Sequence, residues 1–106
     1  MTSLTPFDLA TAGVLTVRGG SQDGMELALS QPVTRLGRGL QADLILEDPT
    51  VSRRHAIIVM RDHEAVLHDD NSLNGTWRNG RRVEDGVVLH DGDVIGVGAA
   101  TLRYVG

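Results

Sequence analysis

Three short segments of the 106-residue sequence carry the side chains best suited to binding an anion. They are an arginine between two glycines (Gly37-Arg38-Gly39), a segment with a serine, two arginines and a histidine (Thr50–His55), and a segment rich in serine and asparagine (Asn71–Thr76). A guanidinium group offers a planar fork of N–H donors that matches a phosphate, and hydroxyl and amide groups add further donors. The residue types therefore predict a phosphate-binding site, provided that the fold brings the three segments together.

The same segments also admit a purely structural interpretation. Arg38 could cap a turn, Arg53 and Arg54 could be solvated surface residues, and Asn74-Gly75 is a dipeptide typical of tight turns. The spacing of these residues alone leaves both interpretations open.

Catalysis is a weaker hypothesis than binding. His55 follows Ser52 by three residues, but a serine nucleophile also needs an orienting acid and oxyanion donors, which this spacing does not supply. His63, His68 and His90 each lie near an aspartate, without the spacing of metal ligands. The sequence therefore predicts a non-enzymatic protein with no catalytic residue, no metal and no cofactor.

The composition excludes several other classes of protein. Cysteine is absent and all ten basic residues are arginine, which rules out disulfides, thiolate sites, a P-loop lysine and Schiff-base chemistry. A net charge of −4 and only three aromatic residues argue against nucleic-acid binding. No apolar run reaches the ~18 residues of a membrane span, so we expect a cytoplasmic protein without membrane contact. The use of arginine alone is compatible with a GC-rich bacterial genome.

Short strands must position the three segments. Apolar runs broken by Gly, Asn, Asp and Pro follow one another from residue 14, and none shows a helical period over more than a few residues. About ten strands at this spacing predict an all-β sandwich, a single domain over 14–106 after a flexible lead-in over 1–13. Asn79-Gly80 predicts a tight turn. We expect strands over 14–18, 25–29, 33–36, 42–46, 56–60, 65–67, 87–89, 94–97 and 101–105, the first two forming one hairpin and 56–60 with 65–67 a second.

Three motifs in collinear order resemble the forkhead-associated (FHA) domain signature. They are Leu36-Gly37-Arg38, the segment DPTVSRRHA over 48–56, and the segment SLNGTWRNG over 72–80. The segment LHDGDVIGV over 89–97 is similar to the final strands of the same family, and the likeness runs from Val14 to Val105. The resemblance implies an FHA-type β-sandwich of about eleven strands whose loops at one end bind phosphothreonine peptides.

The resemblance also implies a role for each residue of the predicted site. Arg38 and Ser52 are expected to bond the phosphate, and Arg53 to contact the phosphate or the peptide backbone. Arg54 is expected to add charge at the rim. Asn74 is expected to bond the ligand main chain just after the phosphothreonine.

One position departs from the family pattern. Many FHA domains read Ser-Thr-Asn-Gly where this chain has Ser72-Leu73-Asn74-Gly75, so one hydroxyl contact with the phosphate is missing and Ser72 or Arg53 is expected to compensate. The phosphothreonine methyl group is expected in a small apolar recess, which disfavours phosphoserine. The residues expected to support the site are Gly37, His55 and Gly75.

The implied partner is a phosphothreonine-containing protein, either a kinase or a kinase substrate, bound by a domain that is monomeric in isolation. The alternative is a phosphate-independent interaction module that uses the same loops or a sheet face. Intact Arg38, Ser52 and Asn74 favour the phosphate-dependent function.

Overall fold

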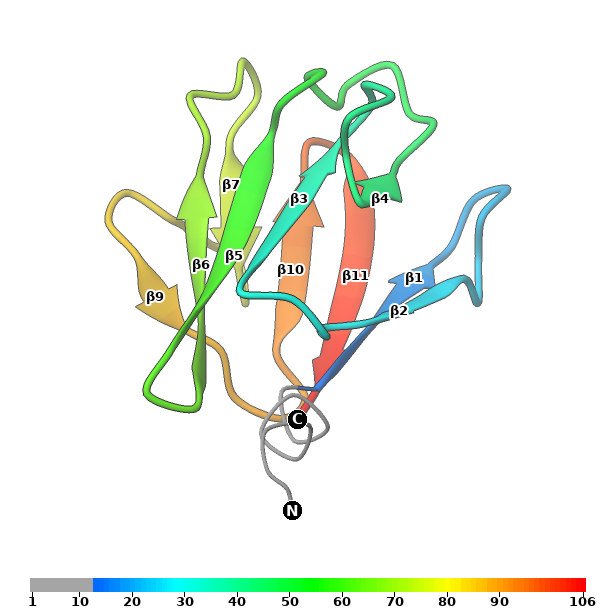
Figure 1. Cartoon of the computed structure of the whole chain (residues 1–106). Helices are drawn as coiled ribbons and strands as arrows, with labels where there is room; N and C mark the ends of the chain where they lie inside the picture. The colour runs from blue at the N-terminus through cyan, green and yellow to red at the C-terminus, as the bar shows by residue number, and fades with distance from the viewer. Residues whose placement is uncertain (1–12) are drawn as a thin grey trace.

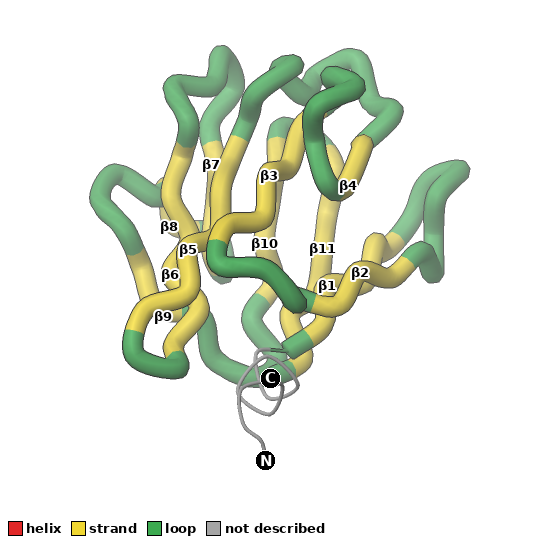
Figure 2. The backbone as a smooth tube through the Cα atoms, viewed as in Figure 1, coloured by secondary structure: helices red, strands yellow, loops and turns green. Residues whose placement is uncertain are grey.

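The computed structural model describes residues 13–106, which form eleven strands in two sheets and contain no helix (Figure 1, Figure 2). Within this range there is accordingly no helix long and apolar enough to cross a membrane. Apart from Gly13, the predicted lead-in over 1–13 lies outside the described residues.

The first sheet has six strands in the order β2-β1-β11-β10-β7-β8. Each neighbouring pair is antiparallel, and the β1–β11 pair aligns Val14 with Val105 and Arg18 with Thr101. The strands are β1 (Val14–Arg18), β2 (Glu26–Ala28), β7 (Thr76–Arg78), β8 (Arg81–Arg82), β10 (Val94–Val97) and β11 (Ala100–Val105).

The second sheet has five strands in the order β4-β3-β5-β6-β9. Strands β3 and β4 run parallel, whereas the other pairs are antiparallel. Because β3 and β4 are parallel, the chain must cross back over one end of the sheet between them. The strands are β3 (Val33–Gly37), β4 (Leu44–Ile45), β5 (Ala56–Arg61), β6 (Glu64–Asp69) and β9 (Val87–Val88).

The core lies between the two sheets and is built by alternation along the strands. In β1, Leu15 and Val17 are buried while their neighbours are half-buried or exposed, and Leu102 and Tyr104 repeat this pattern in β11. Each fully buried leucine contributes about 1.5–3 kcal/mol relative to an exposed one. The other fully enclosed aliphatic residues come from both sheets and their connections: Leu29, Leu36, Leu46, Val51, Ile58, Leu67, Ile95 and Val97.

The all-β sandwich and both predicted hairpins are confirmed. The strands β7 and β8 were not predicted, because their five residues include three arginines and form no apolar run. The turn between them was predicted: Asn79 and Gly80 both have positive φ, 51° and 82°, as a tight hairpin turn requires. Asn74-Gly75, in contrast, does not close a hairpin, since it carries the chain from β6 in one sheet to β7 in the other.

Three connections gather at the upper end of the molecule in Figure 1, away from the C-terminus. They are residues 38–43 between β3 and β4, residues 46–55 between β4 and β5, and residues 70–75 between β6 and β7. The sandwich thus places at one end all three segments that the sequence predicts to bind an anion.

Candidate functional site

Arg38 is held in place by the neighbouring β4–β5 connection. Its backbone N–H donates to the Ser52 carbonyl at 3.0 Å, and the Gly39 N–H donates to the Arg53 carbonyl at 3.1 Å. The side chain is fixed as well, because its Nε donates to the Val51 carbonyl at 2.9 Å. The two terminal nitrogens of the exposed guanidinium make no hydrogen bond or ion pair with the described residues, which leaves them available for an anion.

Gly37 allows the two connections to approach this closely. A Cβ atom at this position would collide with the carbonyl oxygen of Arg53 and lie only 2.9 Å from its carbonyl carbon. Since the obstacle is backbone, a side chain here would push Arg38 away from the Ser52 segment.

His55 joins the β4–β5 connection to the β6–β7 connection. It is fully buried, and its Nδ1 accepts the Ser52 backbone N–H at 2.9 Å. Its proton therefore resides on Nε2, which donates to the Gly75 carbonyl at 2.7 Å. Both ring nitrogens are thus engaged by backbone groups, and neither is free to act as a base toward the Ser52 hydroxyl.

Two further bonds join the same connections at the surface. The Ser52 Oγ accepts the Leu73 backbone N–H at 3.0 Å, and the Asn74 Nδ2 donates to the Thr50 carbonyl at 2.8 Å. The hydroxyl proton of Ser52 and the amide oxygen of Asn74 have no partner among the described residues, so both remain for a ligand.

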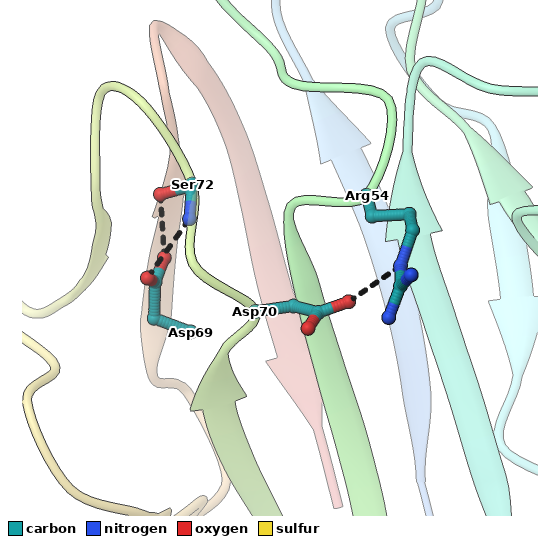
Figure 3. A network of polar contacts seen from close by, with 4 residues as sticks. All are labelled: Arg54, Asp69, Asp70 and Ser72. Atoms are coloured by element: carbon teal, nitrogen blue, oxygen red, sulfur yellow. Dashed lines mark hydrogen bonds and ion pairs between the residues drawn. The ribbon is translucent and has the colours of Figure 1, made fainter.

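The Ser72 side chain faces inward, away from the exposed cluster of Arg38, Ser52 and Asn74. Its hydroxyl donates to Asp69 at 2.6 Å, and its own N–H donates to the same carboxylate at 3.1 Å (Figure 3). The hydroxyl also accepts the Gly75 N–H at 2.9 Å. The Thr76 hydroxyl donates to the same carboxylate at 2.6 Å. Because the single hydroxyl proton of Ser72 is committed to Asp69, this geometry differs from the expected phosphate contact and favours a positioning role.

The Asp69 carboxylate has a lowered pKa. Burial alone would raise the pKa, but the hydrogen bonds from Ser72 and Thr76 together outweigh it. A lowered folded-state pKa stabilises the protein above the unfolded-state value, near 3.8, and this contribution is lost as the pH falls through the folded-state value.

We expect Asp69→Asn to destabilise the protein at pH 7 by about 1–3 kcal/mol, because an amide nitrogen cannot accept the Ser72 backbone N–H that now donates to Oδ2, and the Ser72 and Thr76 hydroxyls lose the charge of the group they donate to. The difference in melting temperature from the wild type should be constant above about pH 5 and shrink at lower pH, when wild-type Asp69 is itself protonated. Thermal unfolding from pH 7 to pH 2.5 measures it. Asp70→Asn is the matched control and should have little effect; a pH-independent Asp69→Asn difference would contradict the assignment.

The two arginines after Ser52 have different surroundings. The Arg54 Nε lies 3.3 Å from Asp70, and the Arg54 side chain is 76% exposed. Asp69 and Asp70 are adjacent but point in opposite directions, toward Ser72 and Arg54 respectively (Figure 3). An exposed pair of this kind contributes little to stability, so Arg54 is easily released to a ligand. The exposed Arg53 side chain forms no ion pair or hydrogen bond within residues 13–106.

Thr50 and Asp69 organise the site but were not singled out from the sequence. The Thr50 hydroxyl donates to Asp48 at 2.6 Å and accepts the Ala99 N–H at 2.7 Å, which brings the β10–β11 connection to the site. The Thr50 hydroxyl, and after it the Thr50 N–H, lower the Asp48 pKa. The detectable signal was an aspartate two or three residues before a serine or threonine, a pattern typical of local side-chain-to-backbone bonds.

Taken together, Arg38 and Arg53 offer guanidinium groups, Ser52 a hydroxyl proton, and Asn74 an amide oxygen. Such a set is suited to binding an anionic group on a peptide, and within residues 13–106 it includes no activated base or nucleophile and no group of metal ligands.

Comparison with known proteins identifies the family of the chain. The family model described as FHA domain matches residues 34–98. The chain is 38% identical over 96 residues to the oxoglutarate dehydrogenase inhibitor of Corynebacterium diphtheriae, covering 91% of this chain and 66% of that protein. It is 38% identical over 94 residues to the glycogen accumulation regulator GarA of Mycolicibacterium smegmatis, covering 89% of this chain and 59% of that protein.

A solved structure from a study of phosphothreonine-dependent FHA domain interactions superposes with a TM-score of 0.82 at 36% identity, covering 90% of this chain and 96% of the other. The chain therefore belongs to the FHA domain family. It spans about two thirds or less of the length of the two bacterial regulators.

Proposed function

We propose that the cluster around Arg38 binds phosphothreonine in a partner protein. The observation that carries the proposal is the fixed geometry of Arg38: Nε is used by the Val51 carbonyl, so the terminal nitrogens are preorganised toward solvent. Threonine phosphorylation adds a charge of about −2 and strong acceptor oxygens, which such a guanidinium binds by charge-assisted hydrogen bonds. The module is a reader of phosphorylation and performs no catalytic step.

Each remaining residue contributes a distinct contact. The Ser52 hydroxyl donates its unused proton to the phosphate, and Arg53 adds a second cation. The amide oxygen of Asn74 accepts the main-chain N–H that follows the phosphothreonine. Ser72 acts indirectly, by fixing the Gly75 N–H and thereby the loop that carries Asn74.

The partner is a phosphothreonine-containing protein, a kinase or a kinase substrate, and we place the interaction in the cytoplasm, where kinases have access to ATP. The isolated domain acts as a monomer. The solved structure of phosphothreonine-dependent FHA interactions supports the ligand class. A phosphate-independent interaction module is the alternative, and the unpaired guanidinium groups at the loop end favour the phosphate-dependent function.

An oriented phosphothreonine-peptide library tests the proposal, with the same library unphosphorylated and phosphoserine-substituted as controls. We expect enrichment only from the phosphothreonine library, because phosphoserine lacks the methyl group. Equal enrichment from the unphosphorylated library would establish the alternative function instead.

Leu73 offers a gain-of-binding test. Its side chain is 84% exposed, and its N–H already donates to Ser52, so the position borders the proposed phosphate site. Leu73→Thr should tighten phosphothreonine-peptide binding about two- to tenfold, the range of one added neutral hydrogen bond. Calorimetry measures the change. Leu73→Val, which has the shape of threonine without the hydroxyl, is the control; equal affinities of the two variants would show that position 73 does not reach the phosphate.

A further inference from the structure

An arginine-rich groove of about 780 Å³ opens beside the proposed phosphate site. It extends from the β3–β4 connection across the outer end of β3 to the start of the β6–β7 connection. The charged residues that line it, together with one exposed leucine, are Arg35, Arg38, Arg53, Arg54, Asp70 and Leu40.

The groove is strongly positive in a chain whose net charge is −4. Four arginines line it against a single aspartate, Asp70, which is paired with Arg54 at 3.3 Å. The proposed function uses Arg38 and Arg53 for the phosphothreonine and Arg54 only as charge at the rim, which leaves Arg35 without a role. The Arg35 guanidinium has no hydrogen-bond or ion-pair partner among the described residues. The cationic capacity of the groove therefore exceeds what one phosphate needs.

The proposed contact of Asn74 with the peptide main chain indicates the direction in which the peptide runs. Asn74 donates to Thr50, and the Thr50 hydroxyl accepts the N–H of Ala99 in the β10–β11 connection, so we expect the ligand residues that follow the phosphothreonine to lie on that side of the site. The groove lies on the other side of the site, because its lining does not include Thr50, Asn74 or Ala99. The ligand residues that precede the phosphothreonine therefore run toward the groove.

We propose that this groove is a second anion subsite, which binds an acidic side chain placed about three residues before the phosphothreonine. The inference rests on the proposed function. Arg35 lies on the extended strand β3 and Arg38 directly follows its last residue, Gly37, so three residues separate their Cα atoms by up to roughly 10 Å. An extended peptide covers the same distance in about three residues. The acidic group is a carboxylate or a second phosphate, since both match a guanidinium fork.

Leu40, which is 91% exposed at the rim of the groove, supplies an apolar contact for the stems of such residues. Release of Arg54 from Asp70 to the ligand would exchange one exposed ion pair for another at little cost.

Four phosphothreonine peptides of otherwise identical sequence test the subsite by calorimetry. The first carries alanine at the second to fourth positions before the phosphothreonine, the second carries glutamate there, and the third a single phosphoserine three residues before it. The fourth carries glutamate at the second to fourth positions after it. We expect the second and third peptides, which carry the upstream charge, to bind about three- to tenfold more tightly than the alanine peptide. The larger of the two gains in affinity identifies the preferred anion. The downstream peptide should show no such gain.

Arg35→Ala provides the decisive variant. It should abolish most of the upstream gain while binding the alanine peptide as the wild type does, and Arg54→Ala should also reduce the gain. Arg61→Ala is the matched control, because Arg61 is an exposed arginine at the far end of β5 in the same sheet. The subsite alone is overturned if upstream charge does not tighten binding to the wild type, or if it tightens binding to Arg35→Ala by the same factor. Failure of every phosphothreonine peptide to bind overturns the proposed function and the subsite with it.

Discussion

Replacing Arg38 by alanine should weaken phosphothreonine-peptide binding by about 10- to 150-fold, equivalent to about 1.5–3 kcal/mol, while the domain remains folded. The loss is large because the guanidinium is the cation whose orientation the fold fixes, through the bond from Nε to the Val51 carbonyl. Calorimetry gives the dissociation constant, and thermal unfolding confirms that the variant is folded. An unchanged dissociation constant would remove Arg38 from the site.

Arg38→Lys separates charge from geometry. A lysine has one ammonium group, which cannot donate to the Val51 carbonyl and also present a two-pronged fork to phosphate. We therefore expect only partial recovery of affinity relative to Arg38→Ala. Full recovery would show that the site needs a positive charge and not the fixed fork.

Replacing His55 by alanine should destabilise the domain by about 2–4 kcal/mol and lower its melting temperature by more than about 10 °C. The imidazole is fully buried, and its removal leaves the Ser52 N–H and the Gly75 carbonyl without their partners and creates a cavity. Peptide affinity should fall as well, because the two connections lose their link. Circular dichroism during heating measures the first effect and calorimetry the second.

Ser52→Ala is the matched comparison for His55→Ala. It keeps the backbone N–H that donates to His55. It removes the hydroxyl, whose bond from the Leu73 N–H is exposed to solvent, so the melting temperature should change little while affinity for the phosphorylated peptide falls. If both variants lose stability equally and strongly, Ser52 is a structural residue and its assignment to the ligand is wrong.

The fold was predictable because its signals are local. Alternating burial in β1 and β11 follows from alternating residue types, and the Asn79-Gly80 turn follows from residues that tolerate positive φ. The gathering of Arg38, Ser52 and Asn74 at one end was predicted from the resemblance to FHA domains, because connections lie at both ends of a sandwich and the residue types alone do not assign each segment to an end. Their contact with a ligand remains a prediction.

The details that depend on long-range pairing could not be predicted. Whether Ser72 faces a phosphate or Asp69 is decided by how the β6–β7 connection crosses between the sheets. The role of Thr50 depends on Ala99, which is 49 residues away in the sequence. The groove needs β3 beside β5 before Arg35 and Arg54 can share a surface, and no local pattern of residue types contains that information.

Phosphothreonine binding by these loops is tested by a nuclear magnetic resonance titration of the isotope-labelled domain with a phosphothreonine peptide and its unphosphorylated counterpart. We predict that only the phosphorylated peptide shifts the amide signals of Arg38, Ser52, Arg53 and Asn74, which lie in the three connections at one end of the sandwich. Equal shifts with the unphosphorylated peptide, or shifts confined to a sheet face such as that of β2, β1 and β11, would contradict phosphothreonine recognition by these loops.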